Sequence, residues 1–300
     1  MNRITPKTYQ SPDQIFPFFA VAVGLVCMLA IADLSQLFLF TLVAVAIFFV
    51  GIPHGALDVI VIEKYCLKQL PFQSSLLKRV ILYGVYLLIV LVCLFFWQSS
   101  PFLGLLTFYV LAIGHFQEDW FELNHFLARI CLASILLSAS VWLYSDNLTS
   151  LFMLLGNDQV TAERFILLLK ALNSISLISL VFIRAFHLYF KTHIKTTLGI
   201  ALSAFLLPPL AFFLAYFCAF HSILHTKRIM TDYQLSRFSF ICWVSIPMVG
   251  TALLAFAFFI MFNNIRAFDE NLFSTTFILL FALTVPHMLL TIWSEKSNCL

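Results

Sequence analysis

The sequence predicts an all-α integral membrane protein that crosses the bilayer repeatedly, and three observations lead to this fold class. Of the 300 residues, 62% are hydrophobic and only 10% are charged, a balance that water-soluble domains do not show. The charged residues lie between long apolar runs, and a spanning helix needs about 20 apolar residues. These runs lack the polar–apolar alternation of barrel strands, so helices are the expected spanning elements.

Nine apolar segments follow one another and predict a polytopic helical bundle of about 8–10 transmembrane or re-entrant helices. The segments cover residues 15–32, 36–60, 79–97, 102–122, 126–145, 163–186, 196–226, 239–262 and 272–293. The first is interpreted as a retained span, because no small-residue cleavage site follows it. No repeat or soluble region interrupts the series, so residues 1–300 are expected to form a single membrane-embedded helical domain.

The positions of lysine and arginine predict how the chain is oriented. Basic residues gather before the first segment and between the second and third: Arg3, Lys7, Lys64, Lys68, Lys78 and Arg79. Such clusters mark cytoplasmic sides, which predicts a multi-pass protein of the cell (cytoplasmic) membrane. The net charge of only +3 forms no basic stripe, so nucleic-acid binding is not expected.

The seventh segment, residues 196–226, has an unusual length. Its 31 uncharged residues, at about 1.5 Å each, are too long for one straight span and too short for two. Pro208-Pro209 interrupts it, and Lys227 and Arg228 follow it. We interpret it as a short re-entrant half followed by a return that ends in the cytoplasm. A long kinked helix, ending on the other side, is the alternative.

Four of the eight histidines lie in apolar segments or at their ends and have unusual neighbours. They are His54 in Gly-Ile-Pro-His-Gly-Ala-Leu-Asp (51–58), His115 in Gly-His-Phe-Gln-Glu-Asp (114–119), and His221 with His225 in His-Ser-Ile-Leu-His. Polar groups at membrane depth are costly and usually face the bundle interior or a cavity, so each is a functional candidate. Three others lie at charged segment edges and are expected to be interfacial: His125, His187 and His193.

The spacing of these histidines predicts a metal site. Residues four apart share one helix face, so His221 and His225 can bind one ion. The same spacing separates His54 from Asp58 and His115 from Asp119; a carboxylate there can accept the second ring N–H and fix the tautomer. Each pair alone is better explained by a satisfied buried histidine. Together they predict four imidazole ligands with two acidic partners.

The predicted orientation places all four histidines near the cytoplasmic ends of their segments, provided that segment 196–226 ends inside. His287, in Val-Pro-His-Met (285–288), lies near the same depth. Its role stays open between a fifth ligand, a residue that holds a ligand, and a helix-packing histidine. Imidazole suits zinc, copper and iron, whereas magnesium and calcium prefer oxygen. No catalytic residue is expected beyond the metal ligands.

Phenylalanine indicates what surrounds the site. The chain has 35 phenylalanines, most of which are expected to face lipid or the core. Phe116, Phe217 and Phe220 lie close to the histidines in sequence and are candidates to line an apolar tunnel. Aromatic faces pack well on a flat conjugated chain.

These motifs resemble those of the Brp/Blh family of bacterial and archaeal membrane β-carotene 15,15'-dioxygenases. The resemblance runs from Pro53-His54-Gly55-x-x-Asp58 through Gly114-His115-Phe116 and His221-Ser222-x-x-His225 to Pro286-His287. It implies iron(II) bound by His54, His115, His221 and His225. It also implies cleavage of the central double bond of β-carotene by O2 to give two molecules of all-trans-retinal, with a microbial rhodopsin as the recipient of the product.

Three other functions compete with this interpretation. A di-iron membrane hydroxylase or desaturase also uses histidine boxes, but it needs about eight clustered histidines, and here only one true pair occurs. A haem-carrying electron-transfer subunit would use two histidines as axial ligands and leave two without a role. A metal transporter should carry polar residues across the full membrane depth, whereas these lie on one side.

Overall fold

The computed structural model describes residues 11–31, 35–71, 74–262 and 266–296, and every regular element in these ranges is helical. Six helical stretches are long and apolar enough to cross a membrane: Gln36–Gln69, Ser75–Ser99, Gln159–Phe182, Pro209–Asp232, Arg237–Met261 and Phe268–Ser294. A pair bent by 104°, Phe126–Trp142 with Ser145–Leu154, makes up to a seventh. The predicted all-α membrane class is therefore confirmed, and the chain is a multi-pass membrane protein.

The α-helices are, in chain order, α1 (Pro12–Ile31), α2 (Gln36–Ala46), α3 (Ile52–Ala56), α4 (Asp58–Val61), α5 (Leu67–Gln69), α6 (Ser75–Ser99), α7 (Pro101–Phe116), α8 (Phe126–Ser138), α9 (Ser145–Leu154), α10 (Gln159–Phe182), α11 (Arg184–Thr192), α12 (Ile194–Leu206), α13 (Pro209–Phe213), α14 (Ile223–Asp232), α15 (Arg237–Phe262) and α16 (Phe268–Lys296). Short 3-10 and π-helical turns join several of them into longer rods.

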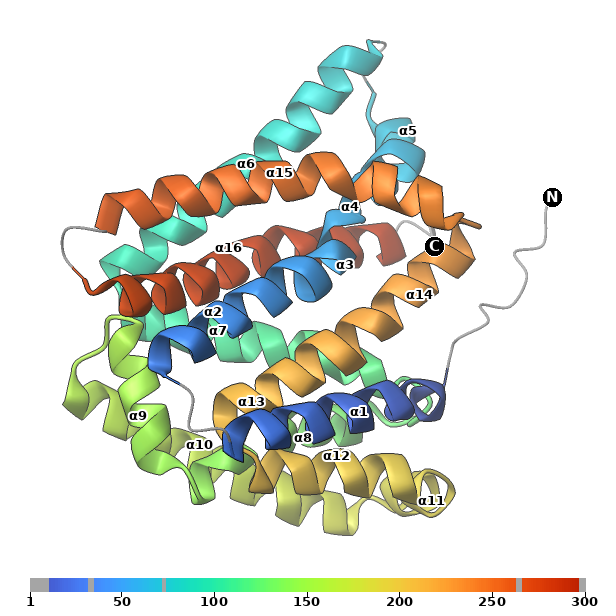
Figure 1. The fold of residues 1–300 in the computed structure, drawn as a ribbon. Helices are drawn as coiled ribbons and strands as arrows, with labels where there is room; N and C mark the ends of the chain where they lie inside the picture. The colour runs from blue at the N-terminus through green and yellow to red at the C-terminus, as the bar shows by residue number, and fades with distance from the viewer. Residues whose placement is uncertain (1–10, 32–34, 72–73, 263–265, 297–300) are drawn as a thin grey trace.

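The rods run between two ends of the molecule. Figure 1 places the start of α1, helices α5 and α11, and the ends of α14 and α16 at one end, with α9, the end of α15 and the start of α16 at the other. The first end carries the basic stretches 64–71, 184–195 and 227–237. This arrangement agrees with the prediction that the basic residues after the second segment and those after segment 196–226 lie on the same face of the membrane.

Segment 196–226 divides at the two prolines, as predicted. Helix α12 ends at Leu206, and Leu207 and Pro208 are extended, with ψ angles of 147° and 146°. The residue before a proline is driven out of the helical region, which accounts for the break. A rod of 24 residues, Pro209–Asp232, then returns alongside (Figure 1). The short half followed by a return describes this segment, and the long kinked helix does not.

Two other segments are shorter than predicted. The expected span 126–145 is α8, followed by a 3-10 turn and a sharp bend into α9. The expected span 102–122 ends as an α-helix at Phe116 and continues as a 3-10 turn, Gln117–Trp120. In both segments a 3-10 turn follows the α-helix, and apolar composition alone does not predict where such a turn occurs.

Three π-helical turns lie in the rods that surround the centre of the molecule. They are η1 (Ile47–Gly51), η2 (Ile62–Cys66) and η5 (Leu214–Ser222). Such turns are uncommon and concentrate at functional sites. Gly51, at the end of η1, lies against the ring of Phe217 in η5, where a β-carbon would collide with that ring. A glycine is therefore needed for the two turns to approach.

Replacing Gly104 with alanine should destabilise the protein. A β-carbon at Gly104 would lie 2.8 Å from two atoms of the Trp97 indole, and that ring is fixed by its Nε1–H bond to the Leu155 carbonyl at 3.0 Å. Overpacking of this kind costs roughly 1–3 kcal/mol. Thermal unfolding in detergent should show a lower midpoint for Gly104→Ala. Gly84→Ala, where a β-carbon meets nothing within 4 Å, is the control; equal midpoints would contradict the prediction.

Candidate metal centre

Five histidines from four rods converge inside the bundle. His54 comes from α3, His115 from α7, His221 and His225 from the η5–α14 rod, and His287 from α16. None is more than 8% exposed. The ring centroids of His115 and His221 are 4.6 Å apart, and those of His54 and His287 are 5.4 Å apart. The structure thus brings together the four histidines predicted as ligands and adds His287 to them.

Local structure fixes the ring of His54. The Nδ1 atom of His54 lies within hydrogen-bond distance of the Gly51 carbonyl oxygen and 3.2 Å from Ser222 Oγ. A carbonyl only accepts, so Nδ1 is the protonated nitrogen. The other nitrogen, Nε2, therefore keeps its lone pair. His54 is thus prepared to act as a neutral ligand.

Asp119 binds two histidines of the η5–α14 rod, His221 and His225. Its carboxylate is fully buried and accepts from His221 Nδ1 at 3.0 Å, from His225 Nε2 at 3.2 Å and from the hydroxyl of Tyr216 at 2.8 Å. These bonds leave His221 Nε2 directed at His115 Nε2, 3.1 Å away. A buried carboxylate is tolerable only with such partners. Asp119 therefore orients the imidazoles on which it acts.

Asp58 plays the same part for His287. Its Oδ1 accepts from His287 Nδ1 at 2.7 Å, and its Oδ2 accepts from the hydroxyl of Tyr86 at 3.0 Å. The remaining ring nitrogen, His287 Nε2, is buried and has no hydrogen-bond partner among the described residues. An unpartnered buried nitrogen costs free energy unless something binds it. His287 Nε2 is therefore available to a ligand.

The carboxylates pair differently from what their spacing predicts. The expected partners were His54 for Asp58 and His115 for Asp119, each four residues apart on one helix. Instead, each carboxylate accepts from a histidine of another rod. The reason is local: a turn at Leu57 separates α3 from α4, and a 3-10 turn replaces the α-helix after Phe116. Neither pair stays on one helix face, so these intrahelical pairings were wrong.

The donor set fits a metal ion that prefers imidazole. Two groups of three residues each have ligand atoms within 4.8 Å of one another: His54, His115 and His287, and Asp119, His221 and His225. The 3.1 Å between His115 Nε2 and His221 Nε2 matches the spacing of about 3 Å that two nitrogens have at right angles around one ion bound at about 2.1 Å. The unpartnered His287 Nε2 adds a third nitrogen. Zinc, copper and iron accept such ligands.

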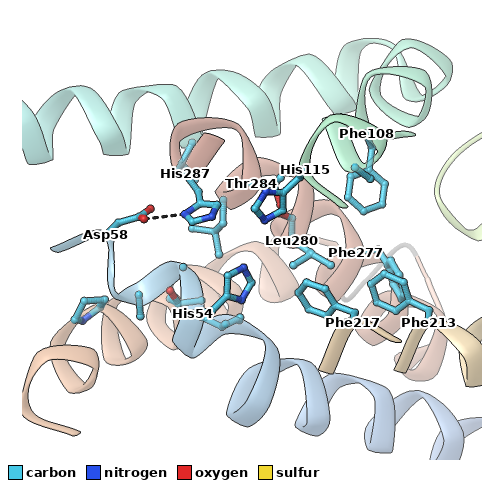
Figure 2. Close-up of a pocket in the computed structure, with 18 of the residues that line it drawn as sticks. His54, Asp58, Phe108, His115, Phe213, Phe217, Phe277, Leu280, Thr284 and His287 are labelled. Carbon is cyan, nitrogen blue, oxygen red and sulfur yellow. Dashed lines mark hydrogen bonds and ion pairs between the residues drawn. The ribbon is translucent and has the colours of Figure 1, made fainter. Parts of the chain in front are cut away.

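A large apolar cavity opens beside the histidines. It measures about 990 Å³ and includes His54, His115 and His287 in its wall, at the upper end of the size range of ligand pockets. Figure 2 shows these three histidines at one side of the cavity and Phe108, Phe213, Phe217 and Phe277 beyond them. The cavity therefore places an apolar ligand directly against the imidazoles.

Two of the three phenylalanines predicted to line the tunnel are in the cavity wall. Phe116 and Phe217 line it. Phe220 packs instead against Trp120 and Phe19, at centroid distances of 5.9 Å and 6.2 Å, and is fully buried away from the cavity. The π-helical turn changes the rotation per residue between Phe217 and Phe220, which separates their faces. Residue order along the chain does not reveal this.

Sequence reasoning missed the two tyrosines that complete the site. Tyr86 and Tyr216 each donate to one of the buried carboxylates. Both lie in apolar runs, and a hydroxyl at membrane depth needs a partner. That need could have marked both tyrosines as members of a buried polar cluster, although it does not identify the group to which each hydroxyl donates.

The fold and the site together define a multi-pass membrane protein with a buried histidine–carboxylate centre facing an apolar cavity. The chain belongs to the β-carotene 15,15'-dioxygenase family, because the profile of the family described as "Beta-carotene 15,15'-dioxygenase" matches residues 45–295. A β-carotene 15,15'-dioxygenase of uncultured marine bacterium 66A03 is 27% identical over 254 residues, covering 81% of this chain and 89% of the relative. No solved structure matches the chain significantly. The family resemblance predicted from the motifs is confirmed.

Replacing Asp119 with alanine should weaken metal binding. Loss of a carboxylate that orients histidine ligands typically lowers metal affinity by about 10–100-fold. Anaerobic titration of the purified protein with Fe(II) measures the change. Tyr216→Phe is the matched comparison, because it removes one hydrogen bond to Asp119 and keeps the carboxylate. Its affinity should fall much less, and unchanged affinity in Asp119→Ala would exclude the orienting role.

Proposed function

We propose that this chain is an iron-dependent oxygenase that cleaves the central double bond of β-carotene with O2 to give two molecules of all-trans-retinal. One observation carries the proposal: in a member of this family, five buried imidazoles converge, and three of them stand in the wall of a mostly apolar cavity. A long polyene fits such a wall, and a redox metal suits such ligands.

In this proposal, His54, His115, His221 and His225 hold a single Fe(II) ion. His287 joins them as a fifth imidazole, because its Nε2 is buried, has no hydrogen-bond partner in the described part of the chain, and is grouped with the ligand atoms of His54 and His115. Bound there, iron would supply redox activation of dioxygen. Neutral imidazoles leave the charge of the ion uncompensated by direct ligands, and Asp58 and Asp119 balance it from behind.

The protein's own residues orient and shield the reactants. Asp119 fixes the ring of His221, and Asp58 fixes that of His287. Phe213, Phe217 and Phe277 form the aromatic wall against which a flat polyene packs. The only other carboxylate in the wall, Glu63, is engaged by Arg79 and Tyr83 among the described residues. No side chain is assigned as a general acid or base, so positioning and exclusion of water are the contributions of the chain.

The setting of the reaction follows from the orientation predicted by the basic residues. We assign the chain to the cell membrane, with the histidine end toward the cytoplasm. β-Carotene dissolves in the bilayer itself, so a membrane enzyme meets its substrate there. Retinal is equally apolar, and a microbial rhodopsin in the same membrane is the proposed recipient.

Expression in β-carotene-producing bacteria should bleach the orange colour and accumulate retinal. His221→Ala and His225→Ala should abolish retinal formation, because each removes an imidazole from the buried cluster. His187→Ala is the matched control, since His187 is exposed and bonds only the Val181 carbonyl in the described structure. It should form retinal at the wild-type rate. Persistent pigment in a strain with well-expressed wild-type protein would refute the proposed function.

Metal analysis of purified protein should find one iron atom per chain. The presence of two separate ligand groups, one with His115 and one with His221, favours a second candidate, a di-iron hydroxylase or desaturase, which would bind two iron atoms. Several bridging carboxylates are usual in helical di-iron sites, whereas Asp119 is the one carboxylate in either group of described residues, which favours one ion. Two iron atoms per chain would support the alternative.

Replacing His287 with alanine should reduce iron retention during dialysis against a chelator, because one nitrogen leaves the ligand group. Asp58→Asn should reduce it less, since the imidazole remains but loses its carboxylate partner. Iron content measured after dialysis, without any assay of turnover, checks both variants. Wild-type retention in His287→Ala would exclude a fifth ligand and leave His287 as a packing residue.

A further inference from the structure

The cavity beside the histidines reaches the outer surface of the bundle on one side. Three residues in its wall are largely exposed: Ile246 is 82% exposed, Leu253 65% and Leu87 51%. Ile246 and Leu253 belong to α15, and Leu87 belongs to α6. A residue that both lines a cavity and faces outward marks its opening. The opening therefore lies between α6 and α15.

The other end of the cavity is closed. Its wall there comes from Leu148, Leu151 and Phe152 of α9 and from Leu155, all of which are buried. The Trp97 indole donates to the Leu155 carbonyl and ties this corner to α6. Along α16, the wall extends from His287 to Phe273, about 21 Å at 1.5 Å per residue. The histidines thus line a cavity that is open on one side and closed at α9.

The opening faces lipid. The windows of α6 and α15 that qualify as spans have mean hydropathies of 2.7 and 2.2, and only 22% and 17% of them are buried. No Asp, Glu, Lys or Arg occurs in residues 238–265. Uncharged, outward-facing surface of this kind contacts acyl chains rather than water. A molecule entering here comes from the bilayer.

Gly250 lies at the opening between α6 and α15, which is called the passage below. It lies in α15, lines the cavity and is exposed, and a β-carbon built on it meets nothing within 4 Å. Neither close packing nor a positive φ angle explains a glycine at this position. Within a helix, glycine costs about 0.5–1 kcal/mol relative to alanine. A larger residue at this position would fill free space in the passage.

We propose that the opening between α6 and α15 is the lateral entrance through which a long apolar polyene passes from the bilayer to the histidines, and that Gly250 keeps it open. This rests on the proposed function. The leading half of the polyene occupies the closed arm, and its middle lies beside His54, His115 and His287. The trailing half stays in the passage.

The test is a bulky substitution at the entrance. Gly250→Phe should lower the kcat/KM for β-carotene in lipid vesicles by about tenfold or more, since the ring fills the passage. Gly84→Phe is the matched control: Gly84 lies on α6, is equally open and is not in the cavity wall. Its kcat/KM should stay within about twofold of the wild-type value. Gly250→Ala should be intermediate.

Readouts other than turnover separate the outcomes. Thermal unfolding and bound iron should be unchanged in Gly250→Phe, which shows that the variant folds and keeps its metal centre. Under anaerobic conditions, β-carotene should protect Cys242, which lines the passage, from a membrane-permeant maleimide, but not Cys27, which is exposed on α1. If wild-type protein cleaves β-carotene while Gly250→Phe matches it and Cys242 is unprotected, the entrance is refuted. If wild-type protein cleaves nothing, the proposed function fails instead.

Discussion

The structure depends on the need to pair buried charge in an apolar interior. Asp58 and Asp119 lie where an unpaired carboxylate would cost several kcal/mol, and each is satisfied only by donors from other rods. Asp58 joins α4 to α16 and α6, and Asp119 joins the end of α7 to the η5–α14 rod. Apolar packing between membrane helices permits sliding and rotation, whereas these bonds select one register. By these bonds the two carboxylates hold His287, His221 and His225, which come from separate rods, in one cluster.

The sequence predicted the parts of this arrangement that are local. Apolar length identified the rods, Pro208-Pro209 identified the break after α12, and membrane depth singled out the buried histidines. The parts it missed are set between rods. Which carboxylate meets which histidine depends on where α3 and α7 stop being regular helices, and the exclusion of Phe220 from the cavity depends on a π-helical turn. Neither feature produces a periodic pattern of apolar and polar residues in the sequence.

The role of His287 illustrates the same limit. Its depth in the last span was predictable, but three roles remained open because depth does not give direction. The structure supplies direction: Nδ1 is bonded to Asp58, so Nε2 must face the other histidines. A ring with two nitrogens has one orientation left once a carboxylate holds the first. The partner of a histidine therefore says more about its role than its position along the helix.

The bend between α8 and α9 has a consequence for the products. By folding inward, α9 stops the far end of the cavity with Leu148, Leu151 and Phe152. A symmetric substrate cut at its midpoint would then yield two chemically identical molecules in unequal positions, one near the lipid and one trapped behind it. The aldehyde nearer the lipid would have to leave before the one at the closed end. In a cavity of this shape, the rate of product release limits turnover as much as the rate of bond cleavage does.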